Sequence, residues 1–230
     1  MGIDVYGAKF LLWCHAQGVD FSRSLQIGRQ MMNVSATELQ TITGWSAEEC
    51  LRLKPPSGTF ADDLLRVLGA QTVDALDASN YEGANITHDL NEPLSGKIYL
   101  EQYSMVLDGG TLEHVFNFPV AIDICKRLVK VDGHFLGISP CNDNAGHGFY
   151  QFSPELYEKV FDEASGFKLK KLCWFQYGLG VWNDVKDLAT ASAGINAARG
   201  MVYLLILAQK VRDVESSVPV QGVWREAWKR

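Results

Sequence analysis

Two histidines and a glutamate occupy positions at which an enzyme could transfer a proton. His114 lies in the segment TLEHVFN directly after Glu113, and His147 lies between two glycines in NAGHGFYQF. Imidazole titrates near neutral pH, so either ring could accept the proton of an alcohol as its oxygen attacks an electrophile. The alternatives are structural, since His114 could orient the turn at the start of a helix and His147 could be an ordinary exposed loop residue.

The loop around His147 is also rich in amides and hydroxyls. Side chains of this kind, gathered at one strand end, can bind several hydroxyl groups of a polar acceptor. We therefore expect substrate contacts from Glu113, Asn142, Asn144, Tyr150 and Gln151. No HxH, HxxxH or carboxylate spacing accompanies His15, His88 or His134, and we expect no metal.

The elements that must position these residues alternate along the chain. Short apolar runs and amphipathic segments follow one another, a pattern typical of α/β proteins with a doubly wound, Rossmann-like and mostly parallel sheet. We expect helices on both faces and a C-terminal antiparallel strand pair. The strands are predicted at 24–30, 72–79, 83–90, 103–110, 133–140, 168–177 and 201–211, and the helices at 6–17, from Ser35, at 60–68, at 119–130 and from Ser153 to before Gly166.

Acidic residues follow three consecutive predicted strands. Asp77 ends the second strand, Asp89 follows the third, and Asp108 with Gly109 and Gly110 ends the fourth. Ligands of open α/β sheets bind at the carboxyl ends of the strands, where one carboxylate can hold both hydroxyls of a ribose and another can face the amine of an adenine. Aspartates also cap loops and helices, but the repetition at successive strand ends favours a nucleoside site.

These segments resemble class I S-adenosylmethionine-dependent methyltransferases. The resemblance is carried by VDALDAS, THDLNEPL, YSMVLDGGTLEHVFN and GHFLGISPCNDNAGHGFYQFSPELY, and it extends from about residue 25 to about 211. It implies S-adenosylmethionine as the cofactor. It also implies a ribose contact from Asp77 with Ala78 beside it, an adenine contact from Asp89 and Leu90, and a place for the methionine part at Asp108, Gly109 and Gly110.

The chain departs from that family in its first strand. A glycine-rich loop should follow this strand and bring backbone amides close to the cofactor, but the sequence has only IGRQ, with Gly28 as the single glycine. Arg29 could pair with the carboxylate of the cofactor, because a guanidinium group suits a carboxylate. Alternatively, Arg29 fills the space of the cofactor or caps a neighbouring helix.

Three functions are compatible with these patterns. The first is O-methylation of a polar small molecule, such as a sugar or a biosynthetic intermediate, with His147 and His114 as catalytic residues. The second is a methyltransferase-fold protein without catalysis that acts as a partner or regulatory subunit. A dinucleotide-dependent oxidoreductase ranks last, because it needs a GxGxxG fingerprint that the sequence lacks.

Composition limits the partners. The 230 residues carry a net charge of −6 and no polybasic tract, so nucleic acid is not an expected partner. Without an apolar run of about 18 residues or a secretory signal, we expect a cytoplasmic protein that does not bind a membrane. We expect a small-molecule acceptor, such as a carbohydrate, as the partner. The sequence is also compatible with an oligomer.

We expect one methyltransferase-like domain over residues 1–230. Within it, the N-terminal helix covers 6–17, an insertion at 44–58 is a candidate lid over the site, and 212–230 forms a tail.

Overall fold

The central feature of the computed structural model is a largely parallel sheet. The structure describes residues 2–53, 60–94, 101–214 and 218–222. Within these ranges, eight strands form the main sheet in the order β5-β4-β2-β6-β7-β10-β8-β9. Their bounds, in sheet order, are β5 (Ile86–Thr87), β4 (Thr72–Asp77), β2 (Arg23–Ile27), β6 (Tyr103–Asp108), β7 (Val129–Asn142), β10 (Val202–Lys210), β8 (Phe167–Gln176) and β9 (Asn183–Asp184).

The first five of these strands are parallel to one another, and β10 is antiparallel to both β7 and β8. Strand β10 therefore lies between β7 and β8 in the sheet, although it comes last in the chain. This arrangement confirms the predicted doubly wound sheet and its C-terminal antiparallel pair. It is also the arrangement that brings the carboxyl ends of β4, β5, β2 and β6 to one edge.

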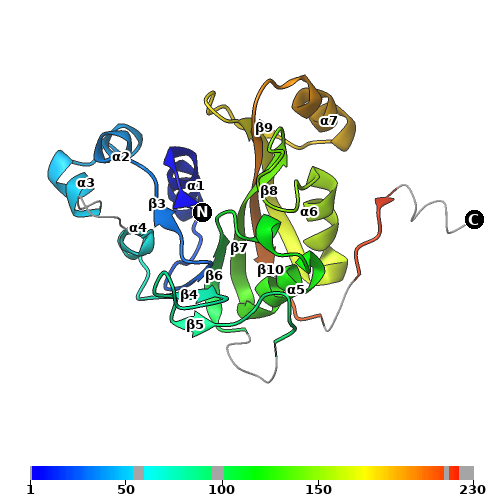
Figure 1. Cartoon of the computed structure of the whole chain (residues 1–230), viewed down its shortest axis with the longest axis horizontal. Helices are drawn as coiled ribbons and strands as arrows, with labels where there is room; N and C mark the ends of the chain where they lie inside the picture. Colours follow the sequence, from blue (N-terminus) through cyan, green and yellow to red (C-terminus); the bar gives the residue numbers. More distant parts are fainter. Residues whose placement is uncertain (1, 54–59, 95–100, 215–217, 223–230) are drawn as a thin grey trace, which may run out of the picture.

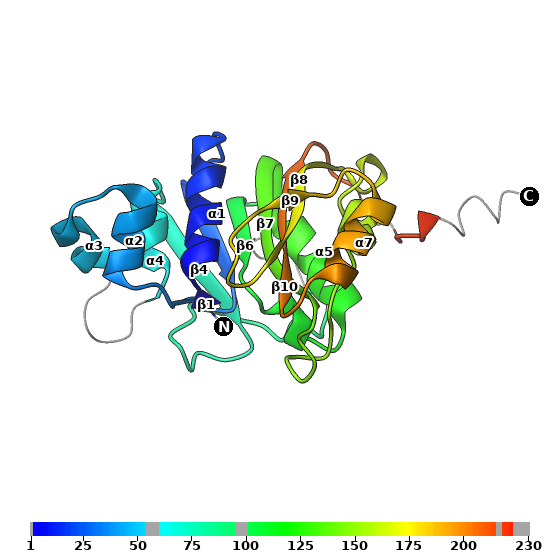
Figure 2. The same cartoon turned by 90° about the horizontal axis from the view of Figure 1, so that it is seen from above.

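Helices cover both faces of the sheet (Figures 1 and 2). Figure 2 shows α1 on one side of the strands and α5 and α7 on the other. The helical elements are α1 (Val5–Ala16), α2 (Ala36–Thr43), α3 (Ala47–Leu53), α4 (Asp62–Val67), the 3-10 turn η1 (Leu112–His114), α5 (Phe118–Leu128), α6 (Pro154–Val160), the 3-10 turn η2 (Glu163–Ser165) and α7 (Leu188–Ala197).

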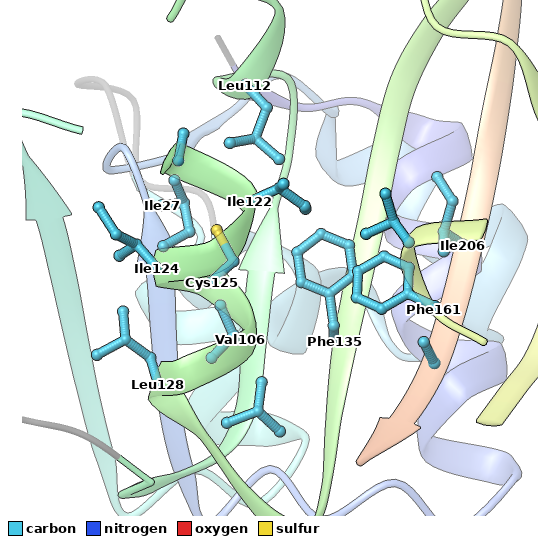
Figure 3. Close-up of a cluster of buried hydrophobic side chains, with 14 of the residues drawn as sticks. Ile27, Val106, Leu112, Ile122, Ile124, Cys125, Leu128, Phe135, Phe161 and Ile206 are labelled. Carbon is cyan, nitrogen blue, oxygen red and sulfur yellow. The ribbon is translucent and has the colours of Figure 1, made fainter. Parts of the chain in front are cut away.

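The core consists of one apolar layer on each face. Helices α1, α2 and α4 pack on one face, and α5 and α6 pack on the other. Figure 3 shows the second layer, where Ile122, Cys125 and Leu128 of α5 recur at helical spacing and Phe135 lies beside Phe161. Burial of each large aliphatic or aromatic side chain contributes about 1.5–3 kcal/mol. These layers make the sheet a rigid support for the loops at its carboxyl edge.

Local sequence signals explain several element boundaries. Ser35 caps α2 and forms the predicted capping box with Glu38. Strand β2 ends at Ile27, three residues earlier than predicted, because Gly28 turns the chain with a φ of +66°. The helix after Ser153 is shorter than predicted and ends at Val160, after which η2 leads to Gly166. Helix α7 was not predicted, since its small residues show little apolar periodicity.

The insertion predicted at 44–58 contains helix α3, and its remaining residues after Leu53 lie outside the described part of the chain. Residues 54–58 of the candidate lid, and 215–217 and 223–230 of the predicted tail, belong to the part that is not described. The lid and the tail stay predictions. Among the described residues, no helix combines the length and the apolar character needed to cross a membrane.

A small second sheet places the N-terminus near the carboxyl edge. Strand β1 (Gly2–Ile3) pairs in parallel with β3 (Met31–Met32), which follows β2. Asp4 comes next and caps α1, accepting hydrogen bonds from the backbone N–H groups of Tyr6 and Gly7. The sequence did not predict this pairing, and it brings a carboxylate to the site described below.

Candidate functional site

Arg29 has its guanidinium group engaged within the protein. Its Nη2 lies 3.1 Å from Oδ1 of Asp62, the first residue of α4, and its Nη1 donates to the carbonyl of Glu82 at 2.9 Å. The guanidinium carbon lies 4.0 Å from the centre of the Phe60 ring. These contacts favour a structural role for Arg29 beside the neighbouring helix α4, because Asp62 already pairs with the guanidinium group that a cofactor carboxylate would need.

Gln30 occupies the space beside Gly109. Its side-chain amide is fully buried, and Nε2 donates to the carbonyls of Ile27 and Gly28 and to Oγ1 of Thr111. A Cβ atom on Gly109 would lie 2.6 Å from Oε1 of Gln30, so a larger residue there would have to displace the Gln30 side chain. Gln30 therefore fills the space between the end of β2 and the Gly109 turn after β6.

The two acids that were predicted to bind a nucleoside lie at the ends of neighbouring strands. Asp77 ends β4 and accepts a hydrogen bond from the N–H of Ala78, while Asp89 follows β5 and accepts two from Asn91. Asp77 is partly exposed and Asp89 is exposed, and the bonds to Asn91 lower the pKa of Asp89. Leu90, expected beside the adenine, is buried in the core. The structure thus brings the two carboxylates to one edge in accessible positions.

Asp108 is buried at the end of β6. Its Oδ1 accepts from the N–H groups of Thr111 and Leu112, whereas its Oδ2 is buried without a hydrogen-bond partner among the described residues. Burial raises the pKa of Asp108 to about 7. The carboxyl group therefore has no nearby donor for its second oxygen at the place where the methionine part of the cofactor was expected.

A cavity of about 160 Å³ opens beside Gly109 and Gly110. Two carboxylates and three aromatic rings contribute to its walls. The lining residues are Gly2, Asp4, Gly109, Gly110, Glu113, Ile138, His147, Phe175, Tyr177 and Tyr203. Burial raises the pKa of Asp4 above its usual value. The cavity is thus lined by two carboxyl groups, Asp4 and Glu113, and by aromatic side chains.

Glu113, His114 and His147 form a compact cluster at this cavity. Nε2 of His147 lies 3.7 Å from Oε1 of Glu113, and the two imidazole rings lie 5.0 Å apart. Glu113 is 1% exposed, and burial is the main reason that its pKa is raised, with the charge of Asp108 adding to the effect. Burial and the nearby His147 lower the pKa of His114, which favours its neutral form. Both sequence-predicted histidines therefore meet one buried carboxyl group.

The loop that carries His147 is held against Glu113 through its backbone. The N–H groups of Phe149 and Tyr150 both donate to the carbonyl of Glu113, at 2.7 and 3.2 Å. Gly148 has a φ of +77°, and a Cβ atom there would lie 2.8 Å from the same carbonyl oxygen. Glycine is therefore required at 148 for both the backbone conformation and the close approach.

The other expected substrate residues do not line the cavity. Asn142 donates to the carbonyl of Ile195, and Asn144 is buried with its N–H bonded to Gln151. Tyr150 donates to the carbonyl of Phe116 and stacks on Phe152. Of the five expected residues, Glu113 lines the cavity, and the other four shape the loop beside it.

Sequence reasoning missed six of the ten residues that line the cavity. Phe175 lies in β8 and Tyr177 directly after it, Tyr203 lies in β10 and Ile138 in β7, and Gly2 and Asp4 belong to the N-terminal segment. Aromatic residues in and beside strands commonly pack in the core, so their types alone do not indicate that Phe175, Tyr177 and Tyr203 line a cavity. A signal for Asp4 was present in its capping position before the first helix, but nothing local links residue 4 to residue 203.

Comparisons with known proteins give similar structures. No protein-family model matches the chain, and no curated protein sequence matches it. One similar solved structure is Burkholderia thailandensis 1,6-didemethyltoxoflavin-N1-methyltransferase, determined with bound 1,6-didemethyltoxoflavin and S-adenosylhomocysteine. It is 16% identical with a TM-score of 0.49, and the match covers 89% of this chain and 79% of that one.

Two further similar structures have the same TM-score. A putative methyltransferase from Bacillus halodurans is 13% identical, with 89% of this chain and 99% of that one covered. A structure of the Haloferax volcanii Trm112 methyltransferase activator in complex with a putative methyltransferase matches at 11% identity, with 89% and 90% covered.

The fold itself follows from the order and direction of the strands. Five parallel strands with β2 and β6 at the centre, and β10 inserted antiparallel between β7 and β8, form the sheet. The chain therefore has the Rossmann-like fold that its resemblance to class I S-adenosylmethionine-dependent methyltransferases implied.

Proposed function

We propose that this chain is an S-adenosylmethionine-dependent methyltransferase that methylates a hydroxyl group of a polar small molecule, such as a sugar or a biosynthetic intermediate. The observation that carries the proposal is the placement of two accessible acids, Asp77 and Asp89, at the same edge as a cavity lined by Glu113 and His147. A nucleoside site and an acceptor site thus lie on one sheet edge, as transfer between two bound molecules requires.

The buried oxygens around the cavity suit the charged part of the cofactor. Three side-chain oxygens are buried without a partner among the described residues: Gln30 Oε1, Asp108 Oδ2 and Glu113 Oε2. Gly109 and Gly110 leave room next to two of these side chains. The cofactor has an ammonium group and a sulfonium centre, and such acceptors stabilise positive charge in a buried site.

In this proposal the adenosine part extends along the edge toward β4 and β5. Asp77 would accept hydrogen bonds from the ribose, with Ala78 alongside, and Asp89 would face the adenine. Gly28 lies between β2 and this region and lets the chain turn. Arg29 stabilises the edge through Asp62 and does not contact the cofactor. When bound, S-adenosylmethionine supplies an electrophilic methyl group.

The acceptor occupies the cavity of about 160 Å³. Its hydroxyl groups can donate to the carboxylates of Asp4 and Glu113, while its carbon skeleton packs on the rings of Phe175 and Tyr203. His147 and His114 are the proposed proton acceptors, because they lie beside Glu113 at the cavity wall. Asn142, Asn144, Tyr150 and Gln151 support the loop that places His147.

A second candidate function has its own support. Arg29 and Gln30 fill space that the glycine-rich loop of the family leaves open, which favours a methyltransferase-fold protein that serves as a partner or regulatory subunit. Such a protein would keep the sheet and lose cofactor affinity. The two candidates therefore differ in one directly measurable property.

Titration calorimetry with S-adenosylhomocysteine distinguishes them. We expect binding to the wild-type protein, and a loss of affinity of at least about tenfold in Asp77→Ala, because hydrogen bonds to a charged group contribute roughly 1.5–3 kcal/mol. Asp63→Ala is the matched control, since Asp63 is an exposed acid that pairs with Arg66 on α4. Absence of binding in all three folded proteins would reject the enzyme and favour the partner subunit.

A further inference from the structure

Glu113, His114 and His147 can each offer one ligand atom to the same metal ion. These atoms all lie within 4.8 Å of one another, and Nε2 of His147 is 3.7 Å from Oε1 of Glu113. Two ligands of one ion at bond lengths near 2.1 Å are separated by at most about 4.2 Å, so small side-chain rotations suffice. We propose that these three residues bind a divalent transition-metal ion at the wall of the cavity.

An independent observation at Glu113 points to a missing positive charge. Its Oε2 is buried and has no hydrogen-bond partner among the described residues, although the side chain is only 1% exposed. Leaving a buried carboxylate oxygen unpaired costs free energy. The described residues that line the cavity include Asp4 and Glu113 but no lysine or arginine. A bound cation would supply the charge that this wall lacks.

The three ligands are held by backbone contacts between two elements. Glu113 and His114 belong to η1, which follows β6 after a three-residue turn at 109–111, and His147 belongs to the loop after β7. The carbonyl of Glu113 accepts two backbone hydrogen bonds from that loop, and Gly148 permits the close approach. Ligands fixed in this way lose little freedom when an ion binds, which favours affinity.

The donor set selects the class of ion. Two imidazoles and one carboxylate suit zinc, manganese, iron or cobalt, whereas magnesium and calcium prefer sites made of oxygen ligands. Three protein ligands also leave coordination positions open. The open positions face the cavity, because Glu113 and His147 line it.

The role of the ion rests on the proposed function, whereas its binding does not. An ion at this place would hold the acceptor through a hydroxyl oxygen and lower the pKa of that hydroxyl, so that its proton is released to solvent water and its oxygen then accepts the methyl group. His114 and His147 would then hold the ion and would not themselves accept the proton. The histidine mechanism and the metal mechanism both place the acceptor hydroxyl at Glu113, His114 and His147. They differ in whether methyl transfer requires the metal ion.

Electron paramagnetic resonance with Mn²⁺ tests the site directly. Manganese is the first probe because it binds thiolates weakly, and the chain contains five cysteines. Untagged protein, freed of metal by a chelator, is titrated without cofactor or acceptor. We expect one ion per chain, and a weakening of at least about tenfold in His147→Ala, given that even indirect changes at metal sites cost 10- to 100-fold. Calorimetry with Zn²⁺ and with Mg²⁺ should rank zinc far above magnesium.

The matched control is His15→Ala. His15 is an exposed histidine near the C-terminal end of α1 and does not line the cavity. The cavity lies at the opposite end of this helix, where Asp4 contributes to its wall. We expect the His15→Ala variant to bind the ion with the same affinity as the wild-type protein. Glu113→Gln is the second ligand variant, and circular dichroism establishes that each variant is folded. His147 is 51% exposed, so its replacement is not expected to affect folding.

Two outcomes would overturn the metal site. One is no saturable binding of Mn²⁺ or Zn²⁺ to the wild-type protein, and the other is unchanged binding in both His147→Ala and Glu113→Gln. Failure of the proposed function gives a different result. Ion binding without any affinity for S-adenosylhomocysteine would keep the metal site and reject the methyltransferase, and the reverse result would keep the methyltransferase alone.

Discussion

The carboxyl edge of the sheet has two halves that differ in how well their polar groups are satisfied. In the half formed by β5, β4 and β2, the guanidinium group of Arg29 is paired with Asp62, and Nε2 of Gln30 donates to oxygens of the protein, while its Oε1 is buried without a partner among the described residues. In the half formed by β6, β7, β10 and β8, Asp108 and Glu113 each keep a buried oxygen without a partner among the described residues. The cationic group of the first half is therefore satisfied within the protein, whereas both buried carboxyl groups of the second half keep an oxygen that a ligand can satisfy.

This difference separates stability from ligand binding. Paired groups such as Arg29 and Asp62 hold strands and helices together, whereas unpaired buried carboxyls reduce stability and are retained where a ligand uses them. In the proposed function, the nucleoside contacts of Asp77 and Asp89 lie in the first half, and the acceptor contacts of Glu113 and His147 lie in the second.

The largest effect is expected from Gly148→Ala, which breaks the contact between η1 and the His147 loop. The new methyl group would lie 2.8 Å from the carbonyl oxygen of Glu113, in a backbone conformation with φ at +77°. We expect the free energy of unfolding to fall by about 3 kcal/mol, from the left-handed conformation and the overpacking together. Urea denaturation measures this loss.

Gly146→Ala is the matched control for this variant. It has a similar φ of +86°, but a Cβ atom there would have no neighbour within 4 Å. We expect a cost of only about 1 kcal/mol. Equal losses in the two variants would contradict the close approach of the loop to Glu113.

A smaller effect, dependent on pH, is expected from Asp108→Asn. Burial raises the pKa of Asp108 from 3.8 to about 7, so between these values the folded protein holds a proton that the unfolded chain releases. The wild-type protein should lose stability as the pH rises through this range. Asparagine does not titrate, so the variant should gain on the order of 2 kcal/mol relative to wild type between pH 5 and pH 8.

Urea denaturation at the two pH values measures this gain. Asp63→Asn is the control, because Asp63 is exposed and pairs with Arg66 at the surface. Its stability should change with pH in parallel with the wild type. Parallel curves for Asp108→Asn as well would show that the buried carboxyl at the end of β6 is not neutralised by burial.

The smallest effect is expected from Arg29→Met, which tests the first half of the edge. Loss of the partly buried pair with Asp62 and of the bond to Glu82 should lower the free energy of unfolding by about 1 kcal/mol, as measured by urea denaturation. Affinity for S-adenosylhomocysteine should stay within about twofold of wild type. Arg66→Met is the control, because its pair with Asp63 is exposed and contributes little. A large loss of cofactor affinity in Arg29→Met alone would assign Arg29 to the cofactor.

Much of the sheet could be predicted because its signals are local. The strand before Asp77 and the strand before Asp108 are short apolar runs, and their ends were predicted to within two residues. The capping box of Ser35 and Glu38 correctly predicted the start of α2. Helix α7 and strand β9 gave weak signals, since the first is made mainly of small residues and the second has only two residues.

The sequence by itself determined the alternation of strands and helices and the acids that follow the parallel strands, because hydrophobic periodicity and turn chemistry act over a few residues. It also identified His114 and His147 as candidates. Only the tertiary structure decided that they meet Glu113, that Asp4 and Tyr203 line the same cavity, and that Arg29 pairs with Asp62. These contacts join segments that are distant in the chain, and their formation depends on strand order and packing, which no local pattern encodes.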